Sequence, residues 1–160
     1  MIKPQSLRDH LTAALPELRN DPDRLLVIIE RGNVVSTLAP GASFEYSYVL
    51  SLVVTDFGGH PDALMVPLLD WVRVHQSELL ANPNRRDQIA FEAEVMANDK
   101  VDVQITLPLT ERVGVHRDAS GDVTIEHYGE PPYEEAVFEA DSWRLYLDGE
   151  VAAEWNTPHG

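Results

Sequence analysis

Long runs of alternating apolar and polar residues constrain the fold of this 160-residue chain more than any other feature. In 101–109 every second residue is aliphatic, and the residues between begin with Asp102, Gln104 and Thr106. The same alternation opens the segment 44–56 and fills 91–97. Successive side chains of a strand point to opposite faces, so this pattern predicts one apolar and one polar sheet face. Such one-sided sheets are typically antiparallel.

Shorter segments complete the predicted sheet. Residues 25–29 form a buried-strand candidate, Gly32 and Asn33 suggest a turn, and 34–37 reads as a short return strand. Residues 113–116 and 123–128 suggest a hairpin around 118–121. In the second half of 44–56 both faces become apolar, as expected for a strand that enters the middle of a sheet.

Two amphipathic helices are expected. In the first, leucines 7, 11, 15 and 18 form a stripe, and Ser6 with Asp9 resembles a capping box. Pro16 should kink this helix or end its first half, because proline removes a backbone donor. The second helix carries an apolar stripe from Leu64 to Leu79, and Pro67 is expected in its first turn or where regular helix begins.

These elements predict an α+β fold, a mainly antiparallel sheet with two helices on its apolar face. The chain length suits one domain, which we place at residues 1–128. A composition break rich in Glu and Pro from Gly129 to Asp141 suggests a linker at 129–142. Residues 143–160 follow as a C-terminal hairpin extension.

The C-terminal hairpin is signalled by Asp148-Gly149 between two runs of strand-forming residues. If Leu147 faces Glu150, one face carries Trp143, Leu145, Leu147 and Ala152, and the other Tyr146, Val151, Ala153 and Trp155. An isolated two-stranded hairpin is marginal in water. This one must therefore dock on its own domain, on a neighbouring copy or on a different protein, which favours a role in assembly.

Charge and composition exclude several classes of function. The formal net charge of −15 argues against general nucleic-acid binding. From Glu126 onward there are nine acids and one base, a local charge of −8 that favours either simple solubility or steering to a basic partner. With no cysteine, the chain has neither disulfides nor a thiol nucleophile. The sequence shows no secretory signal and no membrane-spanning run, so we expect a soluble protein assembled in the cytoplasm.

No pattern indicates a reaction centre. The six histidines include no metal-ligand pair at one-turn spacing, and His75 falls on the apolar helix stripe. The pairs Glu92/Glu94 and Asp99/Asp102 are explained by a polar strand face and by a turn. Phosphate-binding loops and nucleophile elbows are missing too. We therefore expect a binding or structural protein, not an enzyme, without metal or cofactor.

Several short elements together resemble the tail completion protein R family of temperate, contractile-tailed phages of the peduovirus type. The matching elements run in order from end to end. They are Lys3-Pro4, Ser6-Leu7-Arg8 with Leu11-Thr12, Ser36-Thr37-Leu38-Ala39, Ser43-Phe44-Glu45 with Tyr48, Val54-Thr55-Asp56-Phe57 with Gly59, Val66-Pro67 with Leu69 and Trp71, Leu109-Thr110-Glu111-Arg112, Glu130-Pro131-Pro132, and Leu145-Tyr146 with Asp148-Gly149-Glu150. Pro16 departs from the unbroken first helix that the resemblance suggests.

The resemblance implies a virion component of the phage tail that is assembled in the bacterial host cytoplasm. By likeness to tail terminators, the protein would form a ring with itself, expected to be hexameric, on the head-proximal end of the tail tube. The ring would stop tail polymerisation and present a surface to the neck or head connector. Tube proteins, sheath proteins and other completion proteins are the implied partners. The implied fold, two helices against a mainly antiparallel sheet, agrees with the pattern above.

Four aromatic residues are candidates for contacts in such an assembly. Phe57 in the Gly-rich loop is either a contact residue or a buried aromatic at a strand end. Trp143, Tyr146 and Trp155 are of the types most enriched at binding hot spots, so we expect them on an adjacent subunit or on sheath or neck proteins. The alternative is that the hairpin folds back on its own domain. A rival function is an acidic inhibitor or immunity-like module that binds a basic enzyme.

Overall fold

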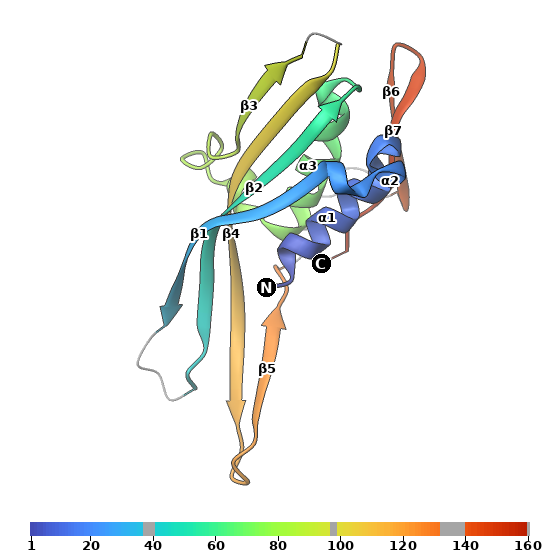
Figure 1. The fold of residues 1–160 in the computed structure, drawn as a ribbon. Coiled ribbons are helices and arrows are strands. Elements are labelled where there is room, and N and C mark those ends of the chain that lie inside the picture. The colour runs from blue at the N-terminus through green and yellow to red at the C-terminus, as the bar shows by residue number, and fades with distance from the viewer. Residues whose placement is uncertain (37–40, 97–98, 132–139, 160) are drawn as a thin grey trace.

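The computed structural model describes residues 1–36, 41–96, 99–131 and 140–159, and within them the chain has the expected α+β fold (Figure 1). The helices are α1 (Lys3–Ala14), α2 (Pro16–Asn20), α3 (Pro61–His75) and α4 (Glu78–Ala81), with a 3-10 turn at Pro22–Arg24. The strands are β1 (Leu25–Ser36), β2 (Phe44–Phe57), β3 (Ala90–Val95), β4 (Val101–Arg117), β5 (Val123–Tyr128), β6 (Ser142–Leu147) and β7 (Glu150–Asn156). Among the described residues, no helix combines the length and hydropathy needed to span a membrane.

Strands β1 to β5 form one antiparallel sheet, in the order β1-β2-β4-β3, with β5 also paired to β4. Among the described residues, β3 pairs with β4 at residues 101–106 and β5 pairs with it at 112–117, so the edge of β4 between them is open. Below the helices, β1, β2, β4 and β5 extend as a long arm (Figure 1). Strand β2 lies inside the sheet, which confirms the expectation from its two apolar faces.

The predicted turn at Gly32-Asn33 is wrong, because residues 25–36 form one continuous strand with a bulge between Ile29 and Arg31. Gly32 pairs with Tyr48, and a Cβ at this glycine would lie 3.0 Å from the Tyr48 Cβ. This glycine therefore permits close strand approach instead of a turn. Thr37, the expected last residue of the return strand, lies outside the described residues.

The strands predicted at 101–109 and 113–116 are parts of a single long strand, β4. Pro108 sits in its middle, in the interval where β4 pairs with neither β3 nor β5. The Thr110 amide donates to the Gln76 Oε1 atom at 3.0 Å, so alternate amides here point away from β2. The nitrogen of Pro108 points the same way as that of Thr110, away from β2. The missing N–H of this proline therefore removes no hydrogen bond between β4 and β2.

Pro16 separates the first two helices as predicted, since α1 ends at Ala14 and Pro16 opens α2. The predicted capping box is wrong: α1 begins at Lys3, and the Ser6 hydroxyl accepts a hydrogen bond from the Trp71 indole at 3.1 Å. The placement of Pro67 is also wrong, because it lies buried inside α3. The Pro67 carbonyl lies 3.1 Å from the His10 Nε2 atom of α1, so this part of α3 faces α1.

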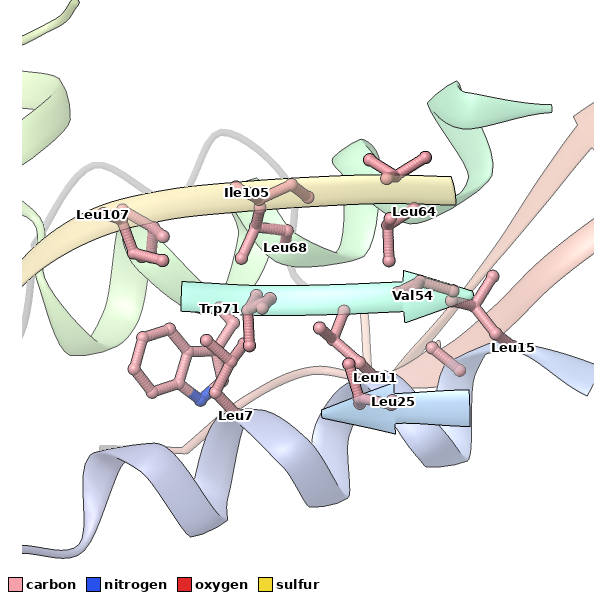
Figure 2. Close-up of a cluster of buried hydrophobic side chains, with 14 of the residues drawn as sticks. Leu7, Leu11, Leu15, Leu25, Val54, Leu64, Leu68, Trp71, Ile105 and Leu107 are labelled. Carbon is pink, nitrogen blue, oxygen red and sulfur yellow. The ribbon is translucent and has the colours of Figure 1, made fainter. Parts of the chain in front are cut away.

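Helices α1 and α3 cover one face of β2 and β4, and the core lies between these layers (Figure 2). Leucines from α1 and α3 meet the alternating aliphatic residues of the strands, and Trp71 closes one end of the cluster. Strand β3 lies beyond this cover, since all six of its residues are exposed. Phe91 faces the helix side, opposite buried Ile105, yet is 66% exposed. The alternating apolar residues of β3 thus point to the helix side of the sheet but do not join the core.

Candidate functional site

The C-terminal hairpin forms where expected, with Asp148 and Gly149 at positive φ in its turn. Leu147 pairs with Glu150 as predicted, but the register shifts between Leu145 and Tyr146. Leu145 therefore pairs with Ala153 and Trp143 with Trp155. The expected division of the two faces is wrong beyond this bulge, because one extra residue moves all later side chains to the other face. Both tryptophans and Ala153 consequently share one face.

This face packs against the hairpin's own domain. Ala153 is fully buried and Trp155 is 6% exposed, and both belong to the hydrophobic core. The Trp155 indole donates to the Asp70 carboxylate of α3 at 2.9 Å, and the Trp143 indole donates to Thr157 at 2.9 Å. The structure thus shows the alternative left open by the sequence, in which the hairpin folds back. Residues 132–139 of the predicted linker lie outside the described residues.

The other face of the hairpin remains available to solvent. Tyr146 is 55% exposed, and Val151, which pairs with it, is also exposed. Between the hairpin and α3 lies a cavity of about 350 Å³, lined partly by Trp143, Trp155 and Arg73. Of the hairpin aromatics, Tyr146 is thus the one that offers its ring to a partner in this conformation. A contact through Tyr146 stays a prediction.

Phe57, the candidate in the Gly-rich loop, is 1% exposed and belongs to the core. An added Cβ at Gly59 would lie 2.9 Å from the Phe57 ring, so this glycine lets the loop pass directly over the aromatic side chain. The ring therefore acts as the buried strand-end aromatic in this conformation and offers no surface to a partner.

A buried carboxylate on β4, that of Glu111, was missed by the sequence reasoning. It is 3% exposed and accepts hydrogen bonds from the Tyr48 hydroxyl at 2.5 Å and from the backbone amide of Ile2 at 2.7 Å. The Lys3 amide lies at 3.3 Å, so this side chain holds the amino end of α1 against the sheet. Burial and the bond to Glu111 raise the pKa of Tyr48. The alternation of β4 offered a signal, since residue 111 falls on the apolar face.

A second buried group, Lys3, joins this anchor to the start of the predicted linker. Its ammonium donates to the Gln76 side chain at 2.9 Å and pairs with Glu130 at 2.8 Å. Gln76 also satisfies the free edge of β4 at Thr110. Lys3, Tyr48, Glu111 and Glu130 all come from the elements that carried the family resemblance. Segments far apart in sequence thus meet in one polar cluster that fixes the amino end of the chain and the start of the predicted linker to the sheet.

The histidines show no arrangement for catalysis. Burial and the nearby Lys3 ammonium lower the pKa of His75 to about 4, and its ring stacks on Trp71 with centroids 4.6 Å apart. Burial likewise lowers the pKa of His10, although a hydrogen bond to the Pro67 carbonyl opposes the shift. Partial burial thus favours the neutral form of both imidazoles.

The carboxylate pairs that the sequence singled out also have local explanations. Glu92 and Glu94 are exposed on β3. Asp99 adopts a positive φ, and Asp102 accepts a hydrogen bond from the Asp56 amide at 2.7 Å. Across the described part of the chain, no cluster of three or more histidine or acidic side chains is arranged to hold a metal ion.

Exposed apolar side chains occur on the edge strands of the sheet. On β1, Leu26, Ile28, Val34 and Val35 are exposed although the strand is twelve residues long. On β5, Val123 and Ile125 are more than half exposed. Unpaired edges with exposed β-branched residues are surfaces that soluble proteins usually protect. They mark the outer strands of the arm as candidate assembly surfaces.

Comparison with known proteins agrees with these observations. The family model of the P2 phage tail completion protein R (GpR) matches residues 1–131. The Tail completion protein R of Escherichia phage P2 is 36% identical over 157 residues, which cover 98% of this chain and 99% of that protein. No solved structure matches the chain. Both names describe a role in completing the phage tail. The chain belongs to the phage tail completion protein R family.

Proposed function

We propose that this protein forms a ring at the head-proximal end of a phage tail tube, where it stops tube polymerisation and prepares the tail for joining to the head. The observation that carries the proposal is the similarity to a protein named for tail completion, which extends over nearly the whole of both chains. Because the match includes the C-terminal hairpin, the proposed role belongs to the complete fold and not to a borrowed domain.

A closed ring explains how such a protein could end a growing tube. Heterologous contacts between identical subunits either close into a ring or continue as an open filament. A ring that matches the tube on one side and presents a different surface on the other leaves no site for the next tube subunit. A sixfold ring is the form proposed here, with the tube, the sheath and neck or other completion proteins as its neighbours. Assembly takes place in the bacterial host cytoplasm, and the mature location is the virion tail.

The charge of the polar sheet face supports the proposal that this face lines the lumen through which DNA passes. This face carries Glu92 and Glu94 on β3 and Asp102 beside them on β4. Acidic groups that line a lumen repel the phosphate backbone and therefore disfavour retention of DNA during its passage. The net charge of −15 in addition favours partners with basic surfaces.

A deletion of the gene from its phage tests the proposal. Without the protein, electron micrographs of lysates are expected to show tails of irregular length that lack heads. Purified protein added to such lysates is expected to cap the head-proximal end and to restore head joining. Antibody label at that end supports the role. Tails of normal length joined to heads without the protein, or label at the opposite end of the tail, would overturn it.

A further inference from the structure

We propose that neighbouring copies of this protein join edge to edge, with strand β1 of one copy pairing antiparallel with strand β5 of the next. This inference names the subunit contact and rests on the proposed ring. It starts from the open edges of the sheet. Strand β1 has a partner only on its β2 side, and β5 has a partner only on its β4 side, among the residues that the structure describes.

Strand direction makes these two edges complementary. Where β1 and β5 reach the same level of the sheet, at residues 35–36 and 127–128, the strands run in the order β1, β2, β4, β5, and each neighbouring pair is antiparallel. With an even number of alternating strands, the two outer strands point in opposite directions. Copies related by rotation about a ring axis keep their strand directions relative to that axis. The β1 edge of one copy therefore faces the β5 edge of the next in antiparallel orientation. Because β5 lies farther along the arm than most of β1, strands tilted to the ring axis bring the two edges into register and continue the hydrogen-bond ladder.

The side chains on the two edges suit such a contact. On the helix side of the sheet, Val34 of β1 and Ile125 of β5 are each 64% exposed, and Val123 lies beside Ile125 on the same face. Apolar pairs across neighbouring strands stabilise a sheet, so one copy's valine covers the other copy's branched residues. On the opposite face, Arg31 of β1 and Glu126 of β5 carry opposite charges. Both edges also lack the proline and lysine that commonly block edge pairing.

Strand β3 is the other unpaired edge on the side of β5, and two observations disfavour it. It carries Glu92 and Glu94, close to Asp102, whereas β1 offers the single cation Arg31 on that face, so pairing there would bring unbalanced carboxylates together. The arm that contains β5 extends beyond the helices, so a neighbouring sheet reaches it without contact between helix layers (Figure 1). These points select β5 as the partner of β1.

Engineered cysteines test this contact cleanly because the natural chain has none. Within one copy β1 and β5 are separated by β2 and β4, a distance of roughly 14 Å at the usual strand spacing. A disulfide needs Cα atoms within about 7 Å, so a bond between these strands forms only between copies. Full-length chains with Val34→Cys combined with Val123→Cys or Ile125→Cys are oxidised and examined by denaturing electrophoresis. A ladder of covalent multimers is expected.

Matched variants define the outcomes. Each single-cysteine chain is expected to stop at dimers, and Val34→Cys with Phe91→Cys on β3 is expected to give no more than the singles. A ladder from the β3 pair, or none from either β5 pair while wild-type rings are visible by electron microscopy, would overturn the contact and leave the proposed ring intact. Absence of wild-type rings on tail tubes would instead refute the ring, whereas a β1–β5 ladder in that case would still support the edge contact.

A charge substitution provides a second measurement. Ile125→Lys should leave the monomer folded, because the side chain is mostly exposed, and should raise the concentration needed for ring formation about tenfold or more. Val151→Lys on the hairpin is the matched control and should leave ring formation unchanged. Ring formation is measured by sedimentation velocity, with circular dichroism as the check on folding. Equal effects of the two lysines would contradict the proposed contact.

Discussion

Replacement of Trp155 by alanine gives the most direct test of how the C-terminal hairpin is held. The side chain is 6% exposed, belongs to the core and donates to Asp70 at 2.9 Å. Removal of a buried tryptophan typically costs about 3–5 kcal/mol of unfolding free energy. A single domain of this size has roughly 5–15 kcal/mol in total, so the loss is a large fraction of its stability. At about 2–4 °C per kcal/mol, the midpoint of thermal unfolding should fall by roughly 6–20 °C.

The assay is urea unfolding followed by far-ultraviolet circular dichroism, which does not depend on tryptophan fluorescence. Tyr146→Ala is the matched control from the same hairpin, and because its ring is 55% exposed we expect a change within about 0.5 kcal/mol. Trp155→Phe isolates the hydrogen bond to Asp70, which should account for about 1.5–3 kcal/mol because the acceptor is charged. If Trp155→Ala unfolds like the wild type but fails to bind tail components, the hairpin docks on a partner and the reasoning is refuted.

Three further perturbations address the buried groups and the turns. Since the pKa of His75 is lowered from 6.5 to about 4, the unfolded chain binds a proton in this range that the folded chain excludes, so unfolding free energy should decline as pH falls from 6.5 to about 4. His75→Gln should flatten that decline in urea titrations at each pH, whereas an unchanged slope, or an equal effect of His60→Gln at an exposed site, would contradict this account. Tyr48→Phe removes a hydrogen-bond donor from the buried Glu111 carboxylate and should lower the free energy of unfolding by about 1–3 kcal/mol in the same assay. Tyr46→Phe is the control and should change it little. Equal losses in the two variants would show that the hydrogen bond contributes nothing. Gly149→Ala imposes a side chain at φ +85° and should lower stability by about 1 kcal/mol, seen as faster amide exchange in β6 and β7. Gly121→Ala, at φ +93°, should instead speed exchange in β4 and β5. The same exchange pattern in both variants would argue against local turn strain.

The periodic segments of the sequence determined the sheet and its helix cover. Alternation in 101–109 and 44–56 predicted strands with one buried face, because side-chain direction in a strand follows directly from residue order. Pro16 predicted the end of α1, and Asp148-Gly149 predicted the last hairpin, because both depend on local backbone restrictions. The family resemblance was likewise present in the linear order of its short motifs.

Tertiary structure decided which apolar faces are covered. Phe91 and Ile105 lie opposite each other on one face, yet only Ile105 is buried, because the helices end before β3. The sequence around Gly32 predicted a turn, whereas the structure places Gly32 in a strand opposite Tyr48. Tyr48 is distant in the sequence, so no local pattern could indicate this contact. Alternation in a sequence predicts the direction of each side chain but not whether another element covers it. Burial therefore depends on how far the covering helices extend over the sheet.

The hairpin illustrates the same division. Its turn and strands were determined by the sequence, whereas the bulge after Leu145 placed Trp143 and Trp155 on one face. A bulge depends on the surface against which the strand packs, here α1 and α3, and thus on residues far away in the chain. The Glu111 carboxylate is a further case, since its donors Ile2 and Tyr48 lie 109 and 63 residues away from it in the sequence. The sequence by itself thus determined the elements and their polarity, and the tertiary structure decided their partners, because partners are set by proximity in space.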